Sequence, residues 1–131
     1  MSGTEAGAEY AALRQAEAIS PKFLYAVDAR SYDAASPAGD LAALTGLARA
    51  AVDAGGGHVL DTSHVIFPNG AITLVLILAE SHLSIHTWPE ENLVAIDLFS
   101  CGAIDGEAVV EHLIAGLRLD SVTVTRLPRG V

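Results

Sequence analysis

The sequence predicts an α+β fold, a two-layer sandwich in which two main helices cover one face of a largely antiparallel sheet. Several segments are rich in β-branched and aromatic residues or alternate polar with apolar side chains, as strands do. Two longer segments carry apolar residues at helical spacing. The segments follow one another as strand, helix, several consecutive strands, helix and strand, and this order favours the sandwich.

Length and charge restrict the class of protein. With 131 residues, 51% of them hydrophobic, the chain is about one domain long and can bury one core. The apolar run at residues 74–79 is far too short for a membrane span, and the N-terminus lacks the pattern of a secretory signal. A net charge of −9 with scattered cations argues against nucleic acid or anionic membranes as partners. The single cysteine fits a reducing compartment, so we expect a cytoplasmic protein.

The first part of the chain predicts a tail, a strand and a helix. Residues 1–20 are expected to form an N-terminal tail, which leaves residues 21–131 as a single domain. Residues 23–27 are rich in β formers and predict the first strand. Ser36 and Pro37 supply an N-cap and a first-turn proline for a helix that stops at three glycines. Its apolar stripe consists of Leu41, Leu44, Leu47, Ala48, Ala51 and Val52.

The second part predicts a run of strands interrupted by one helix. Phe-Pro-Asn-Gly at residues 67–70 and Pro-Glu-Glu-Asn at 89–92 suit tight turns. Two helices leave the other face of the sheet without cover, so we expect a second protomer to pack there in a homodimer. Strands are expected at residues 58–66, 72–79, 83–88, 93–100 and 122–127, and the helix at 105–117.

Residues 79–102, AESHLSIHTWPEENLVAIDLFSCG, concentrate reactive side chains in a sequence that resembles a buried strand. His82, His86 and Glu90 have the spacing of zinc ligands on a helix. Pro89 and the β-branched residues oppose a helix here, so we predict no metal site.

On a strand, His82 and His86 share one face with Ser84 and Trp88. Spacing alone leaves two interpretations open. One is a set of packed, hydrogen-bonded polar side chains in a sheet, and the other is nucleophilic catalysis by a serine or cysteine with a histidine base.

The string ESHLSIHTWPE at residues 80–90 resembles the self-processing segment of the bacterial and archaeal S-adenosylmethionine decarboxylases, E-S-H-[IL]-[ST]-I-H-T-W-P-E. The resemblance continues through AIDLFSCG at residues 95–102. Members of that family are small enzymes made as proenzymes. The resemblance implies that the chain cuts itself between Glu80 and Ser81 and converts Ser81 into a pyruvoyl group, with neither a metal nor pyridoxal phosphate.

The resemblance also implies a role for each reactive residue. Ser81 Oγ would attack the preceding carbonyl, and elimination from the resulting ester would lead to the pyruvoyl ketone. His86 would accept the Ser81 α-proton. The family's assisting serine would fall at Ile72, or at Thr73 if one residue is inserted, and Thr73 is the candidate because it retains a hydroxyl. The ketone would form a Schiff base with the substrate amino group and accept electrons as carbon dioxide leaves. Cys101 would then donate a proton to the substrate α-carbon.

The implied substrate is S-adenosylmethionine, and the implied pathway is spermidine and other polyamine biosynthesis. Glu90 would bind the ribose hydroxyls, Phe67 or Ile66 would stack on adenine, and Trp88 completes the substrate-binding set. Residues 21–24, Pro-Lys-Phe-Leu, depart from the family's G-R-H-L. Two alternatives therefore stay open: the same chemistry on L-ornithine or L-arginine, and an unprocessed homologue that binds a metabolite or a partner.

Overall fold

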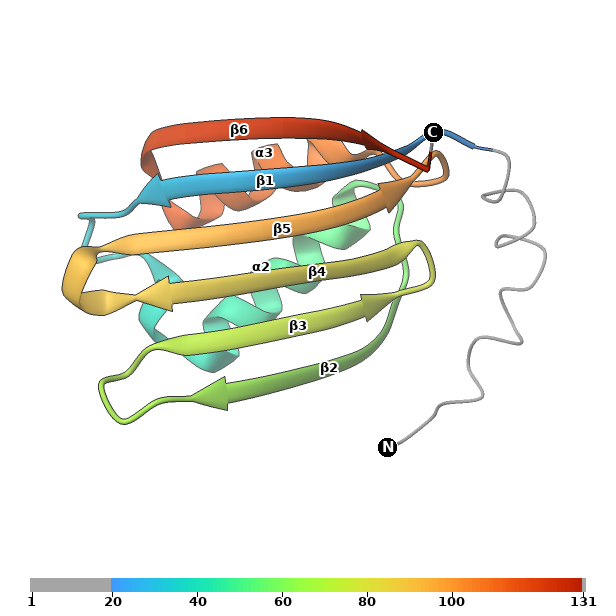
Figure 1. Ribbon diagram of the computed structural model, residues 1–131. Coiled ribbons are helices and arrows are strands. Elements are labelled where there is room, and N and C mark those ends of the chain that lie inside the picture. The colour runs from blue at the N-terminus through green and yellow to red at the C-terminus, as the bar shows by residue number, and fades with distance from the viewer. Residues whose placement is uncertain (1–19, 131) are drawn as a thin grey trace.

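The computed structural model describes residues 20–130 and contains one six-stranded sheet with two helices on one of its faces (Figure 1). The predicted α+β sandwich is therefore confirmed. No helix within the described residues is long and apolar enough to cross a membrane. The expected N-terminal tail lies, apart from Ser20, outside the residues that the structure describes.

The strands coincide with the predicted segments, and the first strand and the last three extend beyond them. They are β1 (Lys22–Arg30), β2 (Val59–Ile66), β3 (Ile72–Leu78), β4 (Ser81–Trp88), β5 (Leu93–Cys101) and β6 (Asp120–Arg129). Their order in the sheet is β2-β3-β4-β5-β1-β6, and every neighbouring pair is antiparallel. The first strand of the chain thus lies between β5 and β6 (Figure 1).

The start of the first helix differs from the prediction. Ser36 and Pro37 begin a separate 3-10 turn, η2 (Pro37–Gly39). Asp40 caps the helix α2 (Leu41–Ala54), because its carboxylate accepts hydrogen bonds from the second and third helical N–H groups at 3.0 and 3.2 Å. A carboxylate that accepts two amide hydrogen bonds also interacts favourably with the helix dipole, which explains why the helix begins here.

The second helix, α3 (Gly106–Leu117), begins one residue after the predicted start and ends where predicted, and Asp105 is its N-cap. It packs closely against the end of α2 at Gly55. A Cβ atom on Gly55 would lie 2.5 Å from Val109 Cγ2 and 2.7 Å from the Asp105 carbonyl oxygen. Only glycine permits this approach, so the glycines that end α2 also set the spacing of the two helices.

Asp33 holds the loop that follows β1. Its carboxylate accepts hydrogen bonds from the Ala35 N–H at 2.8 Å and from the Arg118 guanidinium at 3.1 Å. These contacts, that of Ala35 above all, hold the pKa of the Asp33 carboxyl below its usual range. The loop is thereby tied to the C-terminal end of α3.

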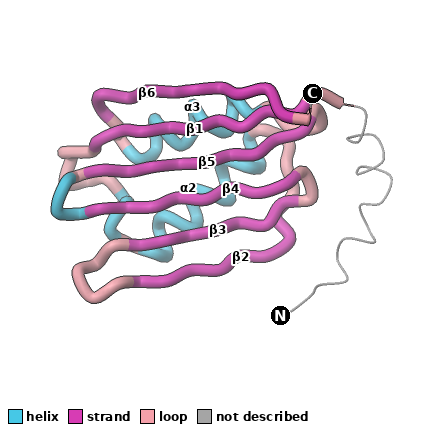
Figure 2. The backbone as a smooth tube through the Cα atoms, viewed as in Figure 1, coloured by secondary structure: helices cyan, strands magenta, loops and turns pink. Residues whose placement is uncertain are grey.

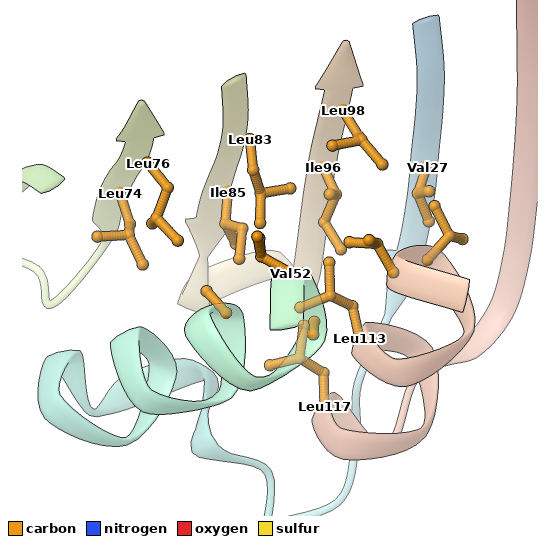
Figure 3. Packing of buried hydrophobic residues seen from close by; sticks show 14 of the residues in the cluster. Val27, Val52, Leu74, Leu76, Leu83, Ile85, Ile96, Leu98, Leu113 and Leu117 are labelled. Carbon is orange, nitrogen blue, oxygen red and sulfur yellow. The ribbon is translucent and has the colours of Figure 1, made fainter. Parts of the chain in front are cut away.

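The core lies between the helices and one face of the sheet (Figure 3). The two faces of β4 differ in their apolar content: Leu83 and Ile85 face the helices and are fully buried, whereas His82 and Trp88 are exposed on the other face. Each fully buried Leu or Ile side chain stabilises the fold by about 1.5–3 kcal/mol relative to an exposed one. The largest fully buried apolar side chains are Leu44, Ile72, Leu74, Leu76, Leu83, Ile85, Ile96, Leu98, Leu113 and Leu117.

The opposite face of the sheet is covered by no helix of the described residues (Figure 1). Ile77, Trp88 and Leu127 expose 45%, 38% and 48% of their surface on this face. Large apolar side chains on a sheet surface indicate a surface that another layer covers. The homodimer expected from the sequence stays a prediction, and this face is where its interface is expected.

The connections mark two ends of the sheet (Figure 2). The β3–β4 turn and the loop after β5 lie at one end. The β2–β3 turn and the 3-10 turn η3 (Pro89–Glu91) lie at the other. The predicted turn at residues 67–70 is confirmed, because the Phe67 N–H donates to the Ala71 carbonyl at 2.8 Å and the Gly70 N–H to the Phe67 carbonyl at 2.9 Å. The proposed site residues are divided between these two ends.

Candidate active site

Ser81 is the first residue of β4, and only Ala79 and Glu80 separate it from β3. Its φ is +142°, in a region of backbone space that favours glycine. A residue with a side chain held there stores about 1–3 kcal/mol of strain. The strain thus lies directly beside the predicted cleavage site, the peptide bond between Glu80 and Ser81.

Cys101 lies next to Ser81, although the two are on different strands. It ends β5, and its Sγ atom is 3.9 Å from Ser81 Oγ. The cysteine is a free thiol with only 3% of its surface exposed, whereas Ser81 is partly exposed. A sheltered thiol at this distance can exchange a proton with an atom held at position 81 with little competition from bulk water.

Glu80 points into the protein, where its side chain is fully buried. Its carboxylate accepts two hydrogen bonds from His58, one from the backbone N–H at 2.9 Å and one from Nδ1 at 2.7 Å. A buried carboxylate requires such compensation for the loss of water. Sequence patterns did not single out His58; the only signal was a polar residue directly after three glycines.

The second group of predicted residues lies toward the other end of β4. Thr73 and His86 face each other across β3 and β4, with Thr73 Oγ1 3.3 Å from His86 Nδ1. The rings of His86 and Trp88 have centroids 6.2 Å apart. These three side chains help to line a cavity of about 360 Å³, whose other lining residues are Phe67, Asn69, Ala71, Thr87 and Glu90.

This cavity combines aromatic surfaces with one carboxylate. Phe67 and Trp88 expose 47% and 38% of their surface. Glu90 Oε2 accepts a hydrogen bond from Asn69 Nδ2 at 3.2 Å, which connects η3 with the β2–β3 turn. Ile66, the alternative to Phe67, does not line the cavity. Such a pocket can stack an aromatic base and hydrogen-bond to hydroxyl groups, and the contribution of Asn69 was not foreseen from the sequence.

The two groups do not meet within one chain. His86 follows Ser81 by five residues on β4, which at about 3.3 Å per residue separates their Cα atoms by roughly 16 Å. The predicted proton acceptor is therefore remote from the Ser81 of its own chain. Within one chain, the predicted site residues thus form two separate groups, Ser81 with Cys101 and the residues of the cavity around His86.

The residues of the zinc alternative are dispersed. The His82 ring stacks on Phe99 with centroids 6.2 Å apart, and Glu90 belongs to η3 rather than to the strand that carries His86. Between residues 20 and 130, no group of three or more His, Cys, Asp and Glu side chains is arranged to hold a metal ion.

Comparison with solved structures defines the class of fold. The crystal structure of the adenosylmethionine decarboxylase from Aquifex aeolicus matches with a TM-score of 0.73 at 24% sequence identity, covering 86% of this chain and 92% of that one. The chain therefore has the two-layer fold of that decarboxylase.

Sequence comparison defines the family. The family model described as S-adenosylmethionine decarboxylase matches residues 24–130. The S-adenosylmethionine decarboxylase proenzyme of Pyrobaculum arsenaticum is 35% identical over 103 residues, which cover 77% of this chain and 78% of that protein. Proenzyme 2 of Bacillus anthracis is 38% identical over 82 residues, 62% of this chain and 67% of that protein. The Thermotoga petrophila proenzyme is 42% identical over 83 residues, 63% of each chain. This chain thus spans roughly two thirds of these two bacterial relatives, and it belongs to the S-adenosylmethionine decarboxylase family.

Proposed function

We propose that this chain is a self-processing, pyruvoyl-dependent decarboxylase that acts on S-adenosylmethionine in cytoplasmic polyamine biosynthesis. The observation that carries the proposal is the strained backbone of Ser81, which lies between an anchored Glu80 and the Cys101 thiol. The names of the relatives, S-adenosylmethionine decarboxylase proenzymes, support both the processing and the substrate.

The processing begins when Ser81 Oγ attacks the carbonyl carbon of Glu80. The amide C–N bond breaks as an ester forms, and release of the strain at Ser81 favours this step. Removal of the Ser81 α-proton then breaks the bond between Cβ and Oγ of Ser81. The fragment 1–80 leaves with Glu80 as its C-terminal carboxylate, and residue 81 becomes dehydroalanine. Addition of water and loss of ammonia convert this residue into a pyruvoyl group at the start of the fragment 81–131.

The surroundings of position 81 fit a pyruvoyl group. The site is open enough for a substrate, because Ser81 is only partly buried, and a sheltered proton donor lies beside it in Cys101. The pyruvoyl group would supply an electron sink when carbon dioxide leaves the substrate. Cys101 Sγ holds the proton that is then delivered to the substrate α-carbon.

The cavity around His86 favours S-adenosylmethionine over ornithine or arginine. Phe67 and Trp88 offer aromatic surface for adenine, and Glu90 is oriented by Asn69 to accept hydrogen bonds from ribose hydroxyls. The flexible cationic chain of a basic amino acid would be better matched by several carboxylates. Glu90 is the single carboxylate among the described residues that line this cavity.

Release of carbon dioxide from S-adenosylmethionine, L-ornithine and L-arginine tests this proposal. We expect turnover of S-adenosylmethionine alone. Glu90→Gln should raise KM about tenfold to a hundredfold with little change in kcat, because a hydrogen bond to a charged group contributes about 1.5–3 kcal/mol. Glu91→Gln is the matched control, since Glu91 is the next residue in η3 but does not line the cavity. Preferential turnover of ornithine or arginine would contradict the proposed substrate. No turnover of any of the three would contradict the proposed decarboxylase activity.

We also infer that a second copy of the chain completes the site. Ser81 and the His86 cavity lie at opposite ends of the sheet, and His86 belongs to the uncovered face. A two-fold axis between two such faces, perpendicular to the strands, would bring the Ser81 of one protomer to the His86 of its partner. The apolar residues exposed on this face support such a homodimer.

Mixed dimers test this arrangement. The Ser81→Ala chain cannot be cut, and the His86→Ala chain should be processed poorly by itself because it lacks the proton acceptor. When the two are co-expressed with different tags, the His86→Ala chain should be cut, since its partner supplies an intact His86. Denaturing mass spectrometry of the mixed dimers provides the readout. If the His86→Ala chain stays whole beside its partner, Ser81 and His86 are not shared between protomers.

A further inference from the structure

His58 makes two hydrogen bonds with Glu80, the residue on the N-terminal side of the bond proposed to be cut. Its backbone N–H and its Nδ1 atom donate to the two carboxylate oxygens of Glu80 at 2.9 and 2.7 Å. The His58 carbonyl accepts a third hydrogen bond, from the Ala79 N–H at 2.9 Å. His58 therefore fixes both the side chain of Glu80 and the backbone directly before it.

The position of His58 is itself set by the core. The preceding Gly57 has no room for a side chain, because a Cβ atom would lie 2.6 Å from Ile104 Cδ1 and 2.8 Å from Val52 Cγ1. The same atom would lie 3.3 Å from Glu80 Oε1. The loop that carries His58 is thus packed tightly against α2 and the loop before α3, and it forms a rigid support for Glu80.

This support lies directly beside the strained residue. A residue with an unfavourable φ keeps that conformation only where the surrounding structure enforces it. On the C-terminal side of Ser81, the pairing of His82 with Phe99 holds the chain in the sheet. On the N-terminal side, the side chain of Glu80 is held through His58. If the hold on Glu80 is lost, the Glu80–Ser81 peptide unit can rotate and the strain can relax.

We propose that His58 is a positioning residue for self-processing, which holds Glu80 so that Ser81 keeps the strained backbone from which its hydroxyl attacks. The inference rests on the proposed function, because it requires that the Glu80–Ser81 bond be cut. His58 does not line the cavity around His86, so it acts through Glu80.

The test compares the rate of self-cleavage in freshly synthesised His58 variants by denaturing mass spectrometry. His58→Ala keeps the backbone donor and removes the imidazole, and it should slow cleavage by roughly tenfold or more. His58→Asn, whose amide nitrogen can take the place of Nδ1, should restore most of the rate. The matched control is His112→Ala, on the exposed side of α3, which should cleave like the wild type.

A second set of variants separates positioning from folding. The His58 side chain is 49% exposed, so its removal leaves little empty space in the core. Thermal unfolding is compared between Ser81→Ala and Ser81→Ala/His58→Ala, neither of which can be cut. If the double variant unfolds at a temperature close to that of Ser81→Ala, the fold does not depend on the His58 side chain. Slow cleavage of His58→Ala is then due to the loss of positioning. If His58→Ala does not fold, His58→Ser keeps a polar residue at this position and should also cleave slowly.

A double-mutant cycle shows whether His58 acts through Glu80. In a Glu80→Ala background, His58→Ala should have no further effect on the rate of cleavage. Cleavage of His58→Ala and His58→Ser at the wild-type rate would overturn this inference while leaving the proposed function intact. A wild-type chain that is never cut would instead overturn the proposed function.

Discussion

Ser81→Ala should leave one intact chain of residues 1–131, whereas the wild-type chain should yield the two fragments 1–80 and 81–131 under denaturing conditions. The substitution removes the only atom that can attack the Glu80 carbonyl from position 81, and the strain at this position cannot break the bond by itself. Denaturing mass spectrometry measures the outcome. The fragment 81–131 should also lack a free N-terminal amine and react with hydrazines, as a ketone does.

Ser84→Ala is the matched control for this experiment. Ser84 lies on the same strand, so its replacement tests whether the loss of any serine hydroxyl from β4 prevents cleavage. We expect the control to be cut like the wild type. An intact wild-type chain, or cleavage of Ser81→Ala at the same bond, would contradict the proposed chemistry.

Cys101→Ala should leave a chain that is cut but turns over slowly. Cys101 Sγ lies 3.9 Å from Ser81 Oγ, where it can deliver a proton to the substrate α-carbon. Loss of a general acid lowers kcat by about 10²–10⁴-fold. KM for S-adenosylmethionine should change little, because Cys101 is not among the residues that line the cavity of Phe67 and Glu90. The readouts are carbon dioxide release and the yield of fragments in the same sample.

Cys101→Ser serves as the comparison for the alanine variant. It keeps a small side chain with an O–H donor, and it should recover part of the lost turnover if proton donation is the role of the residue. Wild-type kcat in Cys101→Ala would assign the proton donor to another group. Equal losses in the two variants would show that a hydroxyl cannot replace the thiol.

Local patterns predicted most of the fold. The alternation in β4 assigned Leu83 and Ile85 to one face and His82 to the other, and the burial of these side chains confirms it. The start of α2 was the main error. Ser36 and Asp40 both have the chemistry of an N-cap, and both cap a helical turn; only the geometry of the chain decides which turn continues into the long helix.

The candidate site was predictable only in part. The resemblance supplied the reactive residues, but the residues that orient them, His58 for Glu80 and Asn69 for Glu90, are brought into place by the tertiary structure. No local pattern encodes a hydrogen bond between residues so far apart in the chain. The separation of Ser81 from His86 was implicit in the strand assignment, since the rise per residue of a strand already places them far apart.

The order of the strands determines what a break between β3 and β4 would do to the molecule. The piece 1–80 would contain β1, and the piece 81–131 would contain β5 and β6, the two strands between which β1 is hydrogen-bonded along its length. The two polypeptides would be interlocked: neither can depart unless a central strand is pulled out of the other's sheet. The break would therefore create two new chain ends without releasing either fragment. The two fragments of the mature molecule would then unfold together in one cooperative transition.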